Sequence, residues 1–504
     1  MFGCRRIAES WELASEDLRA KIGHAFGACP APPIRASAEA CRAFLAARSV
    51  PARVAPLLLP NDSNAAPVHV VLFPEQHFPF AKQFWQHTGM GVSSRLTEYC
   101  LNILQRQPEA KQTPSPELLR HARMPSKTTN KHYAAKPKRC PISLTNCHDE
   151  PLNPKNGDGE LSESFEKDHA VYLEERYGRN LNRCDAAHAK IALRRRIAGL
   201  RDVAIGKEAS VAGSIRGAAV TEDDVFLYQT GMAAIWAAHQ LALGALGEKK
   251  SVCFGFPYAD TVKILEKWGP GCHFFGHGLD TTIDELEALL EEQQAIDPAS
   301  PPVLALFTEF PSNPLLRSAN LPRLRQLADK YDFLIVIDDT IGNFVNVEVL
   351  PYADIVVTSL TKVFSGDSNV MGGSLVLNSA RKHYVTLKAH LSRTYEDTYF
   401  EEDAIFMERN SRDFVRRVAV IDANAEAVCD FLHAAMQSPS PVVRQIYYPK
   451  WQTPENYDAC RVTGERHGGY GGLFSLDFVS AATSTARQGY RSLEPVASYF
   501  YSHL

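Results

Sequence analysis

The sequence lacks several features that would place it in a specialised class of proteins. Its 504 residues carry a formal net charge of only -4, so no excess of one sign draws it to nucleic acid or to an anionic membrane. No run approaches the roughly 20 apolar residues that a membrane-spanning helix needs. The charged N-terminal segment has no apolar stretch typical of a signal peptide. We therefore expect a globular protein of the cytoplasm, with no membrane or nucleic-acid partner.

Paired cysteines are a second absence. The chain has 11 cysteines, and none forms a C-x-x-C pair or stands beside histidines at the spacing of zinc ligands. Reduced thiols are the simpler interpretation, and we expect no metal site. A composition of 45% hydrophobic and 22% charged residues is ordinary for a globular protein, and the length suggests roughly two to four domains.

The character of the chain changes along its length. Residues 1–104 contain an amphipathic pattern at 39–47, an apolar run at 70–73 and an aromatic segment at 80–101, which predict a small N-terminal α/β extension. Residues 105–165 are dominated by Pro, Lys, Ser, Thr and Asn, which is typical of a flexible linker. A loose basic run within it suggests nuclear import or a nucleic-acid patch, but a solvated linker is the favoured interpretation. This run comprises Lys127, Lys131, Lys136, Lys138 and Arg139.

From about residue 166, short apolar runs alternate with helical segments, the pattern of an α/β domain with a mostly parallel sheet. We predict strands at 225–228, 303–307, 333–337, 354–359 and 374–377, and a helix at 231–243. Ligands of such sheets bind at the carboxyl ends of the strands. We assign residues 166–400 to this domain and residues 401–504 to a C-terminal domain.

The segment SLTKVFSGDSNVMGG, residues 359–373, follows one predicted strand end. It places Lys362 close to the hydroxyls of Ser359 and Thr361. An amine that forms an imine must be held rigidly, and nearby hydroxyls and turn amides can bind a phosphate. Most loop lysines are solvated surface residues. A position between a buried strand and a Gly-rich turn favours the reactive role here.

Two further segments follow strand ends. In YQTGMAAIW, residues 228–236, a helix begins at Gly231, where free amides and the helix dipole favour an anion; a turn without a ligand explains the motif equally well. In VIDDTIGNF, residues 336–344, Asp338 and Asp339 end an apolar strand. A buried aspartate is costly to desolvate unless it meets a cation, and a protonated pyridine nitrogen is one candidate. A metal ion or a helix N-cap are the alternatives.

Together these segments resemble the Cys/Met-metabolism family of pyridoxal 5′-phosphate (PLP) enzymes, and most closely the fungal cystathionine γ-synthases. The resemblance runs from about residue 172 to residue 478. The segments AEACRAFLAARS and FAKQFWQHTGMGVSSRLTEYCL also resemble the N-terminal extension of the fungal branch. The resemblance implies PLP as cofactor and an aminotransferase-like domain (fold type I), whose sheet carries helices on both faces.

The resemblance also implies which residues bind the cofactor. Lys362 would be the Schiff-base lysine, Ser359 and Thr361 would bind the phosphate, and Gly231 and Met232 would offer their amides to it.

Other residues would surround the ring. Tyr258, in GFPYADT, would stack on the pyridine ring and assist proton transfer, and Asp338 would pair with the ring nitrogen. Asn313, in EFPSNPLL, would bind the phenolic oxygen or the substrate carboxylate. Without the resemblance, Tyr258 would be interpreted equally well as a core aromatic residue, and Asn313 as a turn residue before a proline. Asp339 stands where most of the family has asparagine and the fungal branch has aspartate.

Tyr177 and Arg179, in YLEERYGRNL, match a Y-x-R pair that reaches the phosphate of a neighbouring subunit. The match implies a homodimer or homotetramer. Without the resemblance, Arg179 would be an ordinary surface residue.

The implied reaction joins cysteine to an activated homoserine ester, O-acetylhomoserine in fungal relatives, and gives cystathionine for transsulfuration and methionine biosynthesis. Alternatives are another γ-replacement or elimination enzyme, of the sulfhydrylase or secondary-metabolite kind, and a non-catalytic PLP-fold protein. Relatives continue past a segment like GGYGG, here residues 468–472, to a late arginine that holds the substrate carboxylate. Residues 480–504 do not resemble that region, so we expect an incomplete C-terminal domain and weakened substrate binding.

Overall fold

A computed structural model shows the fold. It describes residues 27–30, 35–57, 68–105, 186–200, 216, 219–439, 441–464 and 467–479. All of these belong to one compact unit of the chain, made of residues 1–105 and 183–504. The predicted linker lies outside the described residues except at its first position. The domain boundaries drawn from the sequence therefore stay predictions.

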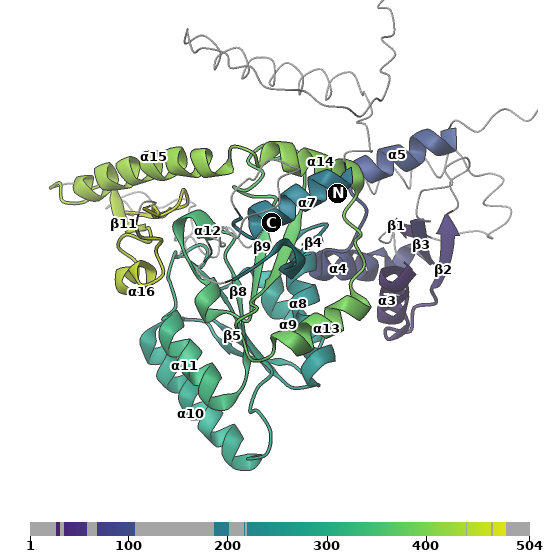
Figure 1. Ribbon diagram of the computed structural model, residues 1–504, viewed down its shortest axis with the longest axis horizontal. Coiled ribbons are helices and arrows are strands. Elements are labelled where there is room, and N and C mark those ends of the chain that lie inside the picture. The colour runs from purple at the N-terminus through teal and green to yellow at the C-terminus, as the bar shows by residue number, and fades with distance from the viewer. Residues whose placement is uncertain are drawn as a thin grey trace, which may run out of the picture. The chain divides into compact units, whose positions relative to one another are not determined.

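The centre of the described fold is a seven-stranded sheet with the order β4-β10-β9-β8-β7-β5-β6 (Figure 1). Its strands are β4 (Val225–Tyr228), β5 (Ser251–Phe254), β6 (Cys272–Phe275), β7 (Ala305–Glu309), β8 (Leu334–Asp338), β9 (Ile355–Ser359) and β10 (Gly373–Leu377). Strands β5 to β9 pair in parallel, and β10 is antiparallel to both of its neighbours, β4 and β9. The prediction of a mostly parallel α/β sheet is confirmed.

The sequence located five of these strands, each within two residues of its observed ends. It missed β5 and β6, whose sequences are SVCF and CHFF. Four residues are too few to show a hydrophobic period. β4 is equally short but apolar throughout (VFLY), whereas β5 begins with Ser251 and β6 contains His273.

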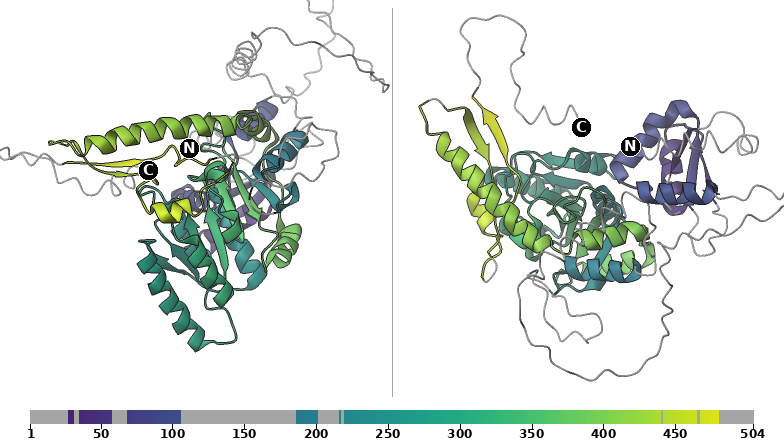
Figure 2. Two further views of the ribbon diagram at one scale, coloured as in Figure 1. Left: turned by 60° about the vertical axis from the view of Figure 1, so that its left-hand side comes forward. Right: turned by 90° about the horizontal axis from the view of Figure 1, so that it is seen from above.

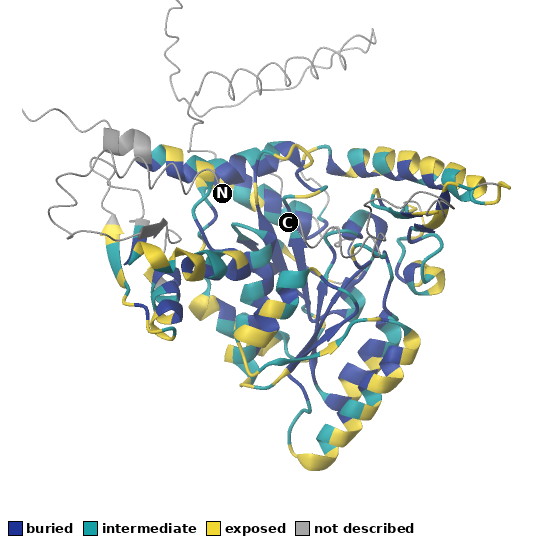
Figure 3. Ribbon diagram, turned by 180° about the vertical axis from the view of Figure 1, so that it is seen from behind, coloured by how far each residue is buried: buried dark blue, intermediate teal, exposed yellow. Residues whose placement is uncertain are grey.

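Side chains along each strand alternate between two layers of helices. On β8, Leu334 and Val336 pack with one layer, whereas Ile335 and Ile337 pack with the other. The first layer contains α8 (Gly231–Leu246), α9 (Ala259–Lys267) and α13 (Tyr384–Thr394). The second contains α7 (Ala186–Ile197), α10 (Asp280–Ile296), α11 (Leu321–Tyr331), α12 (Asn343–Asn346) and α14 (Glu401–Asn410). Burial follows the layers, because the strands are buried while the helices expose their outer faces (Figure 3).

A smaller sheet precedes the large one in the chain. Its strands β1 (Gly27–Pro30), β3 (Val68–Phe73) and β2 (Arg53–Leu57) are antiparallel and lie in that order. The helices α3 (Arg35–Ala46), α4 (Phe78–Thr88) and α5 (Ser94–Gln105) belong to the same segment, with a short turn η1 (Glu75–His77). We call the described residues between 27 and 105 the N-terminal unit.

The C-terminal part is built on the long helix α15 (Phe414–Ala435), which packs against β11 (Val443–Tyr447) (Figure 2). Strand β11 pairs with β12 (Ser475–Phe478), and α16 (Pro454–Asp458) lies between them in sequence. The short turns η4 (Glu222–Asp224) and η5 (Leu350–Tyr352) complete the elements. Residues 480–504 lie outside the described part. Within that part, no helix has the length and apolar character required to cross a bilayer.

Candidate active site

Three parallel strands end in polar residues at one edge of the large sheet. Strand β7 ends at Glu309, β8 at Asp338 and β9 at Ser359. Glu309 is the register partner of Asp338 on the neighbouring strand. Because side chains alternate, Asp338 shares the face of Val336, which packs in the layer of α8 and α9. Asp338 and Glu309 also line one pocket together with Ile235 of α8.

The helix α8 begins directly against this edge. A Cβ atom on Gly231 would lie 2.6 Å from the Cβ of Ser359, so only glycine fits. Thr230 is the N-cap of α8, and its hydroxyl oxygen accepts a hydrogen bond from the amide of Ala233 (3.0 Å). The first amides of the helix, those of Gly231 and Met232, have no carbonyl within the helix to bind. The predicted anion site and the predicted hydroxyl of Ser359 therefore lie side by side.

Asp338 is linked to Ser359 through Thr340, which the sequence did not single out. The amide of Thr340 donates to Oδ1 of Asp338 (2.9 Å), and its hydroxyl accepts from the amide of Ser359 (2.8 Å). Burial raises the pKa of the Asp338 carboxyl to about 6, and the charge of Asp339 acts in the same direction. Within the described residues no cation pairs with Asp338. A cation brought by a ligand would restore its ionised form.

Glu309 is a second acid that the sequence did not identify. Its carboxyl accepts hydrogen bonds from the amide of Tyr258 (2.5 Å) and from the amide of Asn313 (3.3 Å). Burial, followed by the negative charge of Asp338, raises the pKa of Glu309 to about 8. Glu309 therefore holds the loops of two predicted site residues beside Asp338. Both side chains are accessible, since Tyr258 is 44% exposed and Asn313 is exposed.

A sequence signal for Glu309 existed. The predicted strand stopped at residue 307, whereas β7 continues to Glu309. With the correct end, Glu309 would have been an acid at a strand end, like Asp338 on β8.

Lys362 lies in the turn that follows β9. Its amide donates to the carbonyl of Ser359 (3.3 Å), and its own carbonyl accepts from the amide of Gly366 (2.9 Å). Its side chain is exposed, and its amine forms no hydrogen bond or ion pair with the described residues. The backbone of Lys362 thus lies beside the polar strand ends, while its amine contacts none of the other predicted site residues that are described.

Thr361 uses its hydroxyl within this turn. The hydroxyl accepts from the amide of Gly372 (3.1 Å) and donates to the carbonyl of the same residue (3.3 Å). These bonds tie the turn to the residue before β10. A phosphate-binding role for Thr361 stays a prediction.

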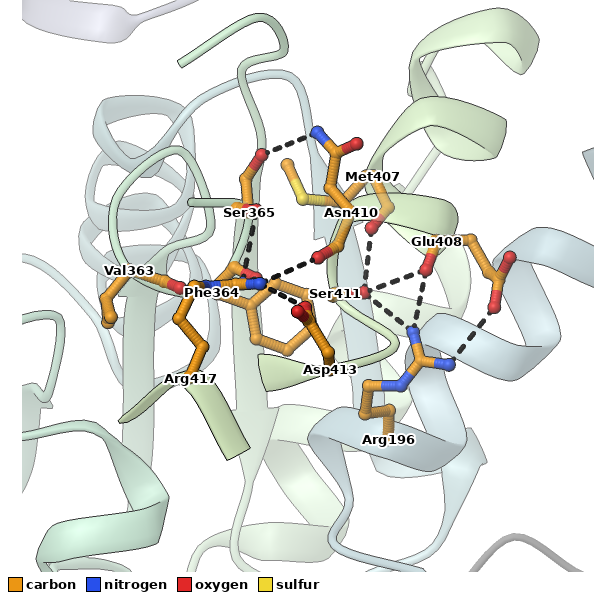
Figure 4. A network of polar contacts seen from close by, with 10 residues as sticks. All are labelled: Arg196, Val363, Phe364, Ser365, Met407, Glu408, Asn410, Ser411, Asp413 and Arg417. Carbon is orange, nitrogen blue, oxygen red and sulfur yellow. Dashed lines mark hydrogen bonds and ion pairs between the residues drawn. The ribbon is translucent and has the colours of Figure 1, made fainter. Parts of the chain in front are cut away.

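The helices α14 and α15 bind the residues that follow Lys362 in the turn (Figure 4). Arg417, on α15, donates through Nη2 to the carbonyls of Val363 (3.1 Å), Phe364 (2.9 Å) and Ser365 (3.2 Å). A hydrogen bond also joins the side chains of Ser365 and Asn410, the last residue of α14 (3.0 Å). Three successive carbonyls and one hydroxyl of the turn thus have protein partners, which favours one backbone conformation.

Asp339 lies on the opposite face of β8 and does not reach the site. It is fully buried, and its carboxylate pairs with the buried guanidinium of Arg216 (3.0 Å). The hydroxyl of Thr358 donates to its other oxygen (2.5 Å). Strand pleating explains the separation from Asp338, because adjacent residues point to opposite faces.

Two predicted residues, Tyr177 and Arg179, lie outside the described part of the chain. Over the described ranges, no cluster of His, Cys, Asp or Glu side chains is arranged to hold a metal ion.

Comparison with known proteins identifies the family of the chain. The profile of the family described as Cys/Met metabolism PLP-dependent enzyme matches residues 215–496, and that of the fungal trans-sulfuration enzyme N-terminal domain matches residues 12–93. The chain belongs to the Cys/Met metabolism PLP-dependent enzyme family. Its cofactor is PLP, and the family predicted from the sequence is confirmed.

Two fungal relatives and one solved structure illustrate the similarity. The cystathionine gamma-synthase-like enzyme iboG2 of Amanita muscaria is 48% identical, over 93% of this chain and 77% of its own length. The cystathionine gamma-synthase of Neurospora crassa is 43% identical, over 81% of this chain and 65% of its own length. A crystal structure of cystathionine gamma synthase from Xanthomonas oryzae pv. oryzae is 22% identical, covers 58% of this chain and 78% of that chain, and has a TM-score of 0.41.

Proposed function

We propose that this PLP enzyme catalyses a γ-replacement that joins cysteine to O-acetylhomoserine and gives cystathionine. The observation that carries the proposal is Asp338. It is a partly buried acid with a raised pKa and no cation partner among the described residues, and it is linked through Thr340 to Ser359. Ser359 in turn contacts the N-terminal residue of α8, Gly231. An acid that lacks a cation, placed beside an anion site, fits a ligand that carries both charges.

PLP is such a ligand, since it has a basic pyridine nitrogen and a phosphate. Asp338 would pair with the protonated nitrogen. The amides of Gly231 and Met232, with the hydroxyls of Ser359 and Thr361, would bind the phosphate. The close approach of Gly231 to Ser359 supports this part, because a side chain at residue 231 would fill the space between helix and strand.

The remaining predicted residues would act on the ring and the substrate. Tyr258 would stack on the pyridine ring, and Asn313 would bind the phenolic oxygen or the substrate carboxylate. The backbone amides of Tyr258 and Asn313 both donate to the carboxyl of Glu309. Because one carboxyl positions both loops, we propose that the two residues act at the same site. Lys362 would hold the aldehyde carbon as an imine.

PLP, when bound, supplies an electron sink that makes hydrogens near the substrate nitrogen acidic. The amine of Lys362 would take a proton from Cα and then one from Cβ of the substrate, and would return protons to these carbons at the end of the reaction. The Cγ–O bond would break as acetate leaves with the electron pair, and the thiolate of cysteine would form the new Cγ–S bond. We further propose a homodimer or homotetramer, in which Tyr177 and Arg179 reach a neighbouring subunit, and a cytoplasmic location.

The name of the Amanita muscaria relative, a cystathionine gamma-synthase-like enzyme, favours a second candidate. The same site would serve another γ-replacement or elimination, with a nucleophile other than cysteine. Acetate release from O-acetylhomoserine, measured with cysteine, with sulfide and with no thiol, separates the two. Acetate release that requires cysteine and yields cystathionine supports the first candidate, whereas acetate release with sulfide or without a thiol supports the second.

The decisive experiment tests Lys362. Purified protein with PLP should show the absorbance band near about 420 nm that a protonated imine of PLP with lysine gives. The Lys362→Ala variant should lose this band and all turnover. Lys382→Ala is the matched control, because Lys382 is an exposed lysine that follows the neighbouring strand β10 and pairs with Asp332. A band that survives in Lys362→Ala, or is lost equally in Lys382→Ala, would refute the assignment.

A further inference from the structure

The loop at the end of α4 lies directly on the first turn of α8. The carbonyl of Gly89 accepts a hydrogen bond from the hydroxyl of Thr230 (3.1 Å). A Cβ atom on Gly89 would lie 2.2 Å from Oγ1 of Thr230, 2.6 Å from the amide nitrogen of Ala233 and 2.7 Å from the Cβ of Met232. The N-terminal unit therefore touches the helix end that is proposed to bind phosphate, with no space for a side chain.

This contact sets the orientation of the helix cap. The hydroxyl of Thr230 has a single hydrogen, which it donates to Gly89. Its lone pair is thereby turned toward the amide of Ala233, from which it accepts. With Ala233 capped, the amides of Gly231 and Met232 remain as the open donors of the first turn. The carbonyl of Gly89 thus helps to hold the Gly231 and Met232 amides in a fixed orientation toward the proposed phosphate site.

An aromatic cluster fixes the N-terminal unit in this place. The indole of Trp268, just after α9, stacks on Phe44 of α3 at 5.0 Å between ring centroids. It also meets the edge of Phe84 of α4 at 5.6 Å and of Trp236 of α8 at 6.3 Å. Such contacts bury large apolar areas and have defined geometry. The end of α4 therefore cannot move freely relative to α8.

A partly buried charge pair forms a second anchor. Arg95 of α5 pairs with Asp403 of α14 (3.0 Å), and its guanidinium lies 3.8 Å from the ring centroid of Phe406. The same helix α14 contributes Asn410 to the Lys362 turn. The N-terminal unit thus contacts α8, at the proposed phosphate site, and α14, which helps to hold the Lys362 turn.

We propose that the N-terminal unit is a positioning element for the cofactor phosphate, and that Gly89 holds the first turn of α8 in its phosphate-binding geometry. This inference rests on the proposed function, in which that phosphate belongs to PLP. It assigns to the N-terminal unit a direct part in cofactor affinity.

A pair of glycine substitutions tests it. Gly89→Ala strains a residue with φ of +61° and also collides with α8. Gly247→Ala is the matched control, because Gly247 caps the other end of α8 with φ of +97° and has no atom within 4 Å of an added Cβ. The PLP dissociation constant of each apo protein is measured by titration at about 420 nm. We expect it to rise roughly five- to thirtyfold in Gly89→Ala, the range of a lost N-cap contact, and less than about twofold in Gly247→Ala.

Wild-type affinity in Gly89→Ala, or an equal loss in both variants, would overturn the proposal. If Gly89→Ala does not fold, Phe84→Leu takes its place, since it loosens the aromatic anchor without touching the loop. A Phe84→Leu protein with unchanged affinity would then count against the inference.

Amide hydrogen exchange of the apo proteins separates this inference from the proposed function. Faster exchange at Ala233 in Gly89→Ala, but not in Gly247→Ala, shows the coupling even without cofactor. A wild-type protein that never develops the band would refute the proposed function. Unchanged exchange at Ala233 would refute the positioning role whatever the protein binds.

Discussion

Two neighbouring aspartates at the end of β8 have opposite surroundings. Asp339 points to the layer of α10 and α11, where Arg216 and Thr358 satisfy both of its oxygens. Asp338 points to the layer of α8, where its register partner on β7 is another acid, Glu309. Burial raises the pKa of both carboxyls, but an arginine opposes this shift only at Asp339.

The difference distinguishes Asp339, an acid paired within the fold, from Asp338, the acid that we propose to pair with the cofactor. A buried acid with a cation partner is satisfied by the fold itself, and loss of that partner leaves an unpaired charge in the core. An acid without one costs stability in the apo protein, and it persists because a ligand completes it. Experiments that exchange or remove these partners can break or sharpen this distinction.

The largest effect should come from removing the cation beside Asp339. Arg216→Met leaves a carboxylate buried without a partner, which should lower the free energy of unfolding by about 3–5 kcal/mol. Urea denaturation of the apo protein measures it. The double variant Arg216→Met/Asp339→Asn should recover much of the loss, because no buried charge is then left over. A single variant as stable as wild type would remove the contrast between the two acids.

Replacement of Asp338 should have a smaller effect, and on turnover and PLP affinity instead of on stability. Asp338→Asn would remove the charged hydrogen bond that we propose to the ring nitrogen, worth about 1.5–3 kcal/mol, so turnover should fall roughly ten- to hundredfold. Steady-state kinetics and PLP titration measure this. The unfolding free energy of the apo protein should stay the same or increase. A marked loss of apo stability would make Asp338 a structural residue like Asp339.

The smallest effect concerns pH. The folded-state pKa values of Asp338 and Glu309 are raised to about 6 and about 8, so between about pH 4 and pH 8 the folded chain holds protons that the unfolded chain has lost. The apo protein should therefore lose stability as pH rises through this window. Between pH 5 and pH 8 the buried Glu309 should contribute more of this loss than Asp338, which is only partly buried. Urea titrations at several pH values measure the slope, and Glu309→Gln should flatten its upper half. A free energy of unfolding that rises with pH would contradict the assigned pKa shifts.

The sequence predicted the parts of the fold and site that have a local signal. Apolar runs revealed β4 and β8, and the motif around Lys362 pointed to the edge at which β9 ends. Contacts between distant segments left no such trace. Arg216 is 123 residues from Asp339, and Gly89 is 141 residues from Thr230, so neither pairing can be inferred from spacing. Glu309 was missed for a local reason, an error of two residues in the end of a strand.

The hydrogen bonds from Arg417 to three carbonyls after Lys362 have a consequence for biosynthesis. During translation, β9 and its turn leave the ribosome well before α15 does, since residue 417 follows residue 362 by a long stretch of chain. Until that helix arrives, the carbonyls of Val363, Phe364 and Ser365 lack the donor that orders them. Nascent chains arrested before α15 should thus fail to retain the coenzyme, even with every strand of the large sheet already made.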